Sequence, residues 1–112
     1  MTAARIERWD VGRDGPLTEA SLERKIQALG FEVEARTYPA GLAQDGRPDN
    51  RDSLVAVMRG LVKLTVDGEP VMLTAGDLAV LPPHAVRRVE AVGPSTALCF
   101  EAYPRREPPG IG

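Results

Sequence analysis

The chain has 112 residues and a mass of 12.1 kDa, which is the size of one small domain and leaves no room for a separate cofactor domain. Apolar residues make up 43% and charged residues 27%, an ordinary globular usage that excludes a disordered or fibrous chain, while a net charge of -2 removes the general phosphate attraction on which nucleic-acid binding depends. The 11 glycines and 10 prolines predict many tight turns, which favours an all-β fold.

The chain has one cysteine, Cys99, so an internal disulfide is excluded and the fold depends on its core alone, as in a protein of a reducing compartment. No apolar run approaches the roughly 20 residues that span a bilayer, and the first residues lack the hydrophobic region of a signal peptide. We therefore expect a cytoplasmic protein whose partner is neither a membrane nor a nucleic acid.

Residues 1–30 predict an N-terminal arm followed by one helix. Residues 1–16 are polar with few apolar anchors, which favours an extended arm. Thr18 is a typical helix N-cap and Gly30 a typical helix stop, so the helix is expected over residues 18–29. The apolar residues that share one face of this helix are Leu22, Ile26 and Leu29.

From Phe31 onwards the hydrophobic pattern repeats every second residue, as in β-strands with one face in water. The expected strands cover residues 31–36, 53–58, 61–66, 71–73, 78–81, 86–92 and 96–102. A polar segment from Pro39 to Asp52 is expected to be a long loop. Short strands with turns between them predict an all-β sandwich or barrel over residues 31–102, and the proline-rich segment 103–112 is expected to be a mobile tail.

Four turn segments of this region match the pattern of one known family. These segments are Arg59-Gly60, Val66-Asp67-Gly68-Glu69, Gly76-Asp77 and Leu81-Pro82-Pro83. Gly41 and Gly60 fit the two ends of a first motif, and Gly76 and Pro82 fit a second motif with five residues between them. In these features the chain resembles the cupins, and in particular the small single-domain bacterial cupins. The resemblance implies a cupin-type jelly-roll barrel preceded by one N-terminal α-helix.

The chain departs from the cupin pattern at the positions where that family holds a metal ion. These positions carry Arg47 and Asp49 in place of the two histidines of the first motif, Ser53 in place of its glutamate, and Arg87 in place of the histidine of the second motif. A longer spacing moves the first pair to Gly46 and Pro48, which are no better as ligands. The one histidine, His84, stands at a glycine position of the second motif. No ligand that the resemblance implies is therefore present.

The residue types lead to the same expectation without the family. A zinc, iron or nickel ion needs several imidazole, thiolate or carboxylate ligands, and one histidine with one cysteine cannot supply them. Cys99 is flanked by Leu98 and Phe100 and is expected to be buried as a small apolar residue. Aspartates in the loop that includes Asp49 stand among arginines, whose charges oppose a divalent cation. We expect neither a metal nor another cofactor.

Arg87 is the residue expected to replace the ion. In a strand it shares a face with Val89 and Ala91, and a barrel turns such a face inward. A guanidinium keeps its charge there, so it needs a carboxylate, a ring of carbonyls or a bound anion. The first hypothesis is an ion pair between Arg87 and Asp49. Its alternative is that Arg87 extends along apolar surface to reach water.

The second hypothesis uses the same residues as an anion receptor. Arg47, Arg87 and either His84 or Arg88 then converge on one opening and hold the carboxylate or phosphate of a small ligand. The ligand-binding residues that we predict are Arg47, Asp49, Ser53, His84 and Arg87. The sequence thus favours a metal-less small-ligand-binding or accessory domain whose barrel mouth is lined by Arg and Asp and whose ligand is a small anion of unknown identity.

The alternative function is a cupin-type enzyme, an isomerase, epimerase or dioxygenase, that acts on a small anionic substrate. The side chains that come into question are Ser53 and His84 with Asp52 or Asp77, the carboxylates Glu90 and Glu101, and the phenols Tyr38 and Tyr103. The serine set lacks the spacing and the strand-to-helix elbow of a catalytic triad. The two glutamates are expected on wet strand faces, and the two tyrosines stand at no recognisable catalytic position. The sequence assigns no catalytic residue.

Exposed strand edges and the N-terminal arm together predict a homodimer, because pairing covers an edge that otherwise exposes unpaired backbone groups.

Overall fold

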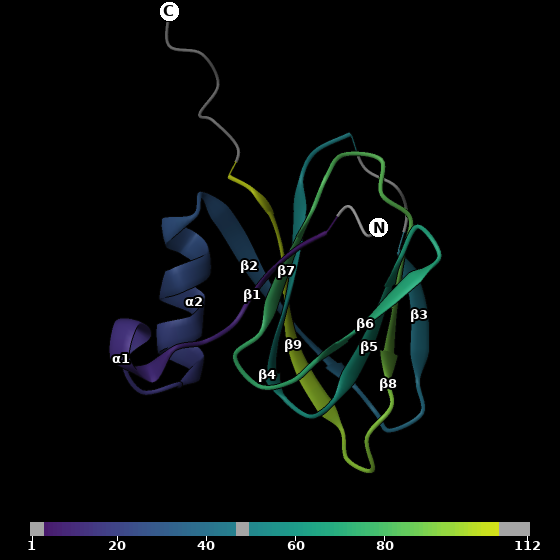
Figure 1. The fold of residues 1–112 in the computed structure, drawn as a ribbon, viewed down its shortest axis with the longest axis horizontal. Coiled ribbons are helices and arrows are strands. Elements are labelled where there is room, and N and C mark those ends of the chain that lie inside the picture. Colours follow the sequence, from purple (N-terminus) through teal and green to yellow (C-terminus); the bar gives the residue numbers. More distant parts are fainter. Residues whose placement is uncertain (1–3, 47–49, 106–112) are drawn as a thin grey trace, which may run out of the picture.

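Two antiparallel sheets face each other across the core (Figure 1). The computed structural model describes residues 4–46 and 50–105. The five-stranded sheet has the order β1 (Arg5–Glu7), β7 (Leu78–Leu81), β4 (Ser53–Arg59), β9 (Ala97–Pro104) and β2 (Phe31–Tyr38). The four-stranded sheet has the order β3 (Ala43–Gly46), β8 (Arg87–Ala91), β5 (Val62–Val66) and β6 (Glu69–Leu73). The predicted all-β barrel with an N-terminal helix is confirmed.

Alternation along the strands divides the buried apolar residues between two cores. The core between the two sheets includes Val55, Val57, Val62, Leu64, Leu73, Leu81, Val89 and Cys99. The core between the five-stranded sheet and the helix includes Leu22, Ile26, Phe31, Leu54, Ala56, Leu78 and Phe100. Strand β4 contributes to both cores, which explains why its apolar residues follow one another without interruption.

The helix α2 (Glu19–Ala28) packs against the outer face of the five-stranded sheet (Figure 1). Thr18 caps it: the hydroxyl of Thr18 accepts from the backbone N–H of Ser21, and the hydroxyl of Ser21 accepts from the backbone N–H of Thr18. The helix predicted over residues 18–29 is confirmed. A short helix that the sequence did not predict, α1 (Val11–Asp14), begins after Asp10. Within the described chain neither helix has the length and apolar character needed to cross a membrane.

Two segments predicted to lack strands contain them. The N-terminal arm includes β1, which pairs with β7, and the predicted loop from Pro39 to Asp52 includes β3, which pairs with β8. Neither segment shows apolar alternation in its sequence. Both are held as strands by backbone pairing with a strand distant in the sequence. Strand β9 also extends two residues further than predicted, to Pro104. The expected tail beyond residue 105 lies outside the described residues.

The four glycines that carry the family resemblance all have a backbone conformation that favours glycine. The φ angles are +84° at Gly41, +94° at Gly60, +85° at Gly68 and +89° at Gly76. At Gly76 an added Cβ would lie 2.4 Å from the Cβ of Trp9, so this turn also lets the N-terminal segment pack directly against the barrel. Gly60 and Gly76 are therefore set by both backbone geometry and close approach, and Gly41 and Gly68 by backbone geometry alone.

Candidate functional site

Arg87 lies on the inner face of β8 and is only 7% exposed. It alternates with the buried Val89 and Ala91, whereas Arg88 points outward and pairs with Asp45 at 3.0 Å. The inward orientation predicted for Arg87 is therefore confirmed, and the alternative in which its guanidinium reaches water does not hold.

Described residues from two other strands satisfy the guanidinium. Its Nη2 donates to Oε1 of Glu101 at 3.0 Å and to the hydroxyl of Tyr103 at 3.2 Å, both on β9. Its Nη1 donates to Oγ of Ser53, at the start of β4, at the longer distance of 3.4 Å. A charge-assisted bond between two buried groups is the strongest of these contacts, so Glu101 is the principal partner of Arg87.

Glu101 is 8% exposed and receives a second donor from the other side. The hydroxyl of Tyr38, at the end of β2, donates to its Oε2. Burial, together with this bond to a carboxylate, raises the pKa of Tyr38 well above its usual range, so the phenol stays protonated as a donor. Arg36 approaches Oε1 of Glu101 at 3.6 Å from the partly exposed side. Both oxygens of the carboxylate are thus engaged.

We call Arg87, Glu101, Tyr38, Tyr103 and Ser53 together the Arg87 cluster. Its shape depends on a glycine in the neighbouring strand. Gly46 on β3 is the register partner of Arg87, and an added Cβ there would lie 2.6 Å from Nε of Arg87. The arginine side chain therefore lies directly over the glycine backbone, and a larger residue at position 46 would displace it.

The ring of Tyr103 lies between two arginines. The guanidinium carbon of Arg51 is 5.0 Å from its centroid and that of Arg87 is 5.8 Å away. Both distances are within the range of cation–π attraction. Tyr103 thereby links the buried cluster to the surface segment before β4.

Of the ligand-binding residues that the sequence predicted, the structure brings Ser53 and Arg87 into contact. His84 lies in the turn between β7 and β8, with a positive φ of +67° and an exposed side chain, and takes no part in the hydrogen bonds of the Arg87 cluster. Arg47 and Asp49 lie outside the described residues, so the proposed contact between Arg87 and Asp49 stays a prediction.

The sequence did not identify Glu101 as a partner of Arg87. It placed this glutamate on a wet face, which is wrong, because Glu101 is on the same side of β9 as the fully buried Cys99. The alternation from Cys99 to Glu101 to Tyr103 was the available signal. Glu90, its suggested companion, lies on the outward side of β8 with Arg88.

The Arg87 cluster does not fit a metal ion. A guanidinium is not a metal ligand, and its positive charge opposes a cation. The carboxylate of Glu101 already accepts from Arg87 and Tyr38. Cys99 is fully buried in the apolar core between the two sheets and makes none of the hydrogen bonds to Arg87. Among residues 4–46 and 50–105, no three His, Cys, Asp or Glu side chains are grouped so that they could hold an ion.

An open pocket of about 330 Å³ lies beside the cluster. Its lining residues are Glu32, Val33, Glu34, Glu101 and Tyr103. Since Glu101 and Tyr103 belong to both, a molecule in this pocket would touch the side chains that hold Arg87. On its β2 side the pocket presents the carboxylates of Glu32 and Glu34, and Arg36 pairs with Glu34 at 3.4 Å.

The sequence of the chain matches the cupin domain family over residues 39–103, which is more than half of its length. No curated protein matches the chain.

Solved structures share the fold at low sequence identity. A protein from Photorhabdus luminescens is 16% identical with a TM-score of 0.63, and the similarity covers 69% of this chain and 64% of that protein, just under two thirds of its length. A cupin protein from Bacteroides fragilis is 23% identical with a TM-score of 0.58, covering 74% of this chain and 73% of that one. The cupin domain of an XRE family transcriptional regulator from Enterobacter cloacae is 12% identical with a TM-score of 0.63, covering 94% and 99%. These identities show the fold alone.

Proposed function

The chain belongs to the cupin domain family, and on that premise we propose that it is a metal-independent domain that binds a small polar ligand. The observation that carries the proposal is the buried pair of Arg87 and Glu101, 3.0 Å apart. Arg87 stands where the resemblance places a metal-binding histidine. The positive charge at this position of the barrel interior is therefore supplied by the guanidinium of Arg87, which Glu101 neutralises, in place of a metal ion.

The charges around the pocket favour a ligand without net negative charge. Glu101 neutralises Arg87, and Glu32 and Glu34 add two further carboxylates to the lining, of which Arg36 balances one. A carboxylate or phosphate ligand would have to displace Glu101 from the guanidinium or lie against these glutamates, and both cost electrostatic energy. A neutral polyol or a small amine meets no such penalty and finds hydrogen-bond partners in the glutamates and in Tyr103.

A role as an accessory or sensing domain fits the size of the chain. The structure from Enterobacter cloacae whose similarity covers 94% of this chain is the cupin domain of a transcriptional regulator. Transfer of that role to this chain rests on fold likeness alone. A cytoplasmic location belongs to the same proposal, because the buried, free Cys99 fits a reducing compartment.

A cupin-type enzyme is the second candidate, and one observation favours it. Tyr103 lines the pocket while its hydroxyl also bonds to Arg87, so a phenol and the carboxylate of Glu101 face the same space. Such a pair is able to exchange protons with a bound molecule. The strong engagement of Glu101 by Arg87 and Tyr38 weakens this candidate, because a base must be free to accept a proton.

A thermal-shift panel tests the proposed function. The probes are glucose as a neutral polyol, putrescine as a cation, and inorganic phosphate and succinate as anions, each with and without EDTA. At ten times its Kd a ligand stabilises the folded state by about 1.4 kcal/mol, which corresponds to roughly 5 °C in Tm for a domain of this size. We expect such a shift from the polyol or the amine and no effect of EDTA.

Tyr103→Phe is the matched variant, since it keeps the ring and removes only the hydroxyl, which accepts from Arg87 beside the pocket. It should reduce the ligand-induced shift, measured from the variant's own Tm without ligand. Stabilisation by phosphate or succinate alone would contradict the proposed ligand class and support the anion receptor. Loss of Tm on EDTA addition would contradict metal independence.

A further inference from the structure

Strand β2 is a long sheet edge that is paired on one side only. It pairs with β9 on one side, in an unbroken register from Phe31 to Tyr38, and no other described strand pairs with it. The other edge strands are blunted: β1 has three residues, β3 has four, and β6 carries Pro70. Short strands, prolines, bulges and charged side chains are the usual means by which proteins avoid edge pairing. β2 has eight residues, no proline and no bulge, and its charged residues Glu32, Glu34 and Arg36 are of both signs, so a register that sets opposite charges against each other is open to it.

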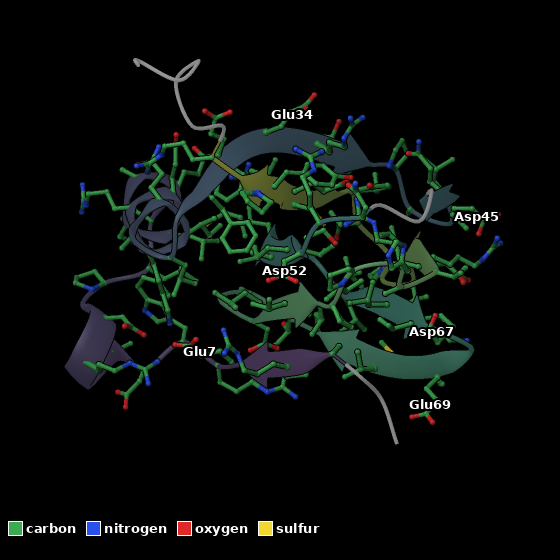
Figure 2. All side chains as sticks on the ribbon, turned by 90° about the horizontal axis from the view of Figure 1, so that it is seen from above. Glu7, Glu34, Asp45, Asp52, Asp67 and Glu69 are labelled. Atoms are coloured by element: carbon green, nitrogen blue, oxygen red, sulfur yellow. The ribbon has the colours of Figure 1, made fainter. Side chains whose placement is uncertain are left out.

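The middle of β2 is open to solvent. Glu32, Glu34, Ala35, Arg36 and Thr37 are all exposed. Figure 2 shows β2 at the rim of the molecule, with Glu34 pointing away from it. A strand of this length with free backbone donors and acceptors is a template for a further strand.

We propose that β2 pairs antiparallel with β2 of a second copy of this chain, about a two-fold axis at Ala35. The sequence of β2 selects this register. With the axis at Ala35, Glu34 of each copy faces Arg36 of the other, and the small Ala35 faces itself. An axis one residue earlier places Glu34 against Glu34, and an axis one residue later places Arg36 against Arg36. Like charges directly opposite each other on adjacent strands are destabilising, so both shifted registers are disfavoured.

The second copy would also complete the pocket. In the register centred on Ala35, its Arg36 lies opposite Glu34 and its Tyr38 opposite Glu32, and both of these glutamates line the pocket. The partner's guanidinium would thus add a second positive charge at Glu34, beside the Arg36 of this chain. The proposed dimer depends on β2 alone, and only the contribution of the second copy to ligand binding rests on the proposed function. Dimerisation and ligand binding can therefore each fail without the other.

Cysteine cross-linking tests the register. Opposite residues of an antiparallel pair have Cα atoms about 4.5–5.5 Å apart, and a disulfide accepts up to about 7 Å. Ala35→Cys should therefore give a covalent dimer on mild oxidation. Thr37→Cys is the matched control on the same face of the same strand, because its two copies would be about 14 Å apart. The wild type, whose one thiol Cys99 is fully buried, should stay uncross-linked.

Charge exchange tests the pairing itself, with the solution mass measured by light scattering and sedimentation. Wild type should be a dimer. Glu34→Arg should raise the dimer Kd about tenfold or more, since it places like charges opposite each other twice per dimer, and the double variant Glu34→Arg/Arg36→Glu should restore dimerisation. A monomer at about 0.1 mM would overturn the proposal. A dimer in which Thr37→Cys cross-links as readily as Ala35→Cys, or in which the double variant dimerises no better than the single one, would overturn it equally.

Discussion

Among residues 4–46 and 50–105 two carboxylates are buried, and each pairs with an arginine of different exposure. Asp77, in the turn before β7, is 4% exposed and pairs with Arg8, whose side chain is 59% exposed. Glu101, on the inner face of β9, pairs with Arg87, which is as buried as Glu101 itself. One pair joins the N-terminal segment to the barrel from outside, and the other lies inside the barrel.

The difference in burial decides what each pair does. Asp77 also accepts from the backbone N–H of Thr74, so its carboxylate holds the turn whether or not Arg8 is in place. Arg87 and Glu101 each lose their hydration, and each depends on the other for a counter-charge. We therefore expect the inner pair to respond strongly to the loss of one partner and the outer pair to respond weakly.

The largest effect is expected when one inner charge is removed. Glu101→Leu leaves the guanidinium of Arg87 buried without a counter-charge, and we expect a loss of about 3–5 kcal/mol in the free energy of unfolding, measured by urea denaturation. The double variant Arg87→Met/Glu101→Leu removes both charges and should recover most of this loss. The single variant Arg87→Met completes the cycle, and a double-variant loss equal to the sum of the two single losses would show that the two residues are not coupled.

Gly46→Ala should have the next largest effect. The new methyl group would push against Nε of Arg87, which hydrogen bonds hold in place, and overpacking of this kind costs about 1–3 kcal/mol. In an Arg87→Ala background the same substitution should cost clearly less. Urea denaturation of the four proteins measures the difference, and an undiminished cost would mean that the guanidinium does not set the requirement for glycine.

Alkaline pH gives a smaller, graded effect on the inner core. Burial raises the pKa of Cys99 from 9.0 to about 12, so above pH 9 the unfolded chain releases this proton while the folded chain keeps it. The stabilisation is complete below pH 9 and is lost as the pH rises towards 12, by up to about 1.4 kcal/mol per pH unit. Stability measured between pH 8 and 10 should therefore fall more steeply in wild type than in Cys99→Ala. Parallel slopes would contradict this account.

The smallest effect is expected at the outer pair. Arg8→Ala removes a side chain that is mostly in water, and such ion pairs contribute about 0–1 kcal/mol. The loss should shrink further in 0.5 M salt, because the exposed pair is screened. A loss comparable to that of Glu101→Leu would erase the distinction between the two pairs.

The sequence predicted the elements that carry their own local signals. The strand at residues 78–81 lies between a glycine turn and two prolines, and the structure confirms its bounds. The helix after Thr18 has a cap and an apolar face, and it too is confirmed. Strands β1 and β3 have no such signal, since partner strands distant in sequence hold them, and no periodicity could reveal them.

The sequence predicted the inward position of Arg87 but not the residues that pair with it. Alternation with Val89 and Ala91 placed Arg87 inside the barrel, but the partner of Arg87 depends on how β8 and β9 meet across the two sheets, which no local pattern encodes. From the sequence Glu101 resembled a solvated charge. The structure places it on the inner face of β9, the same side as the buried Cys99. Gly46 resembled an ordinary loop glycine. The requirement for glycine at this position comes from the side chain of Arg87 in the adjacent strand, which the local sequence does not reveal.

The metal content of the purified protein tests the central claim most directly. After purification without chelator and incubation with zinc, nickel, manganese and iron, followed by desalting, elemental analysis should find far less than one metal ion per chain, in wild type and in Glu101→Gln alike. One ion per chain in wild type, lost on substitution of Glu101, would contradict the account in which the guanidinium of Arg87 stands in place of the ion.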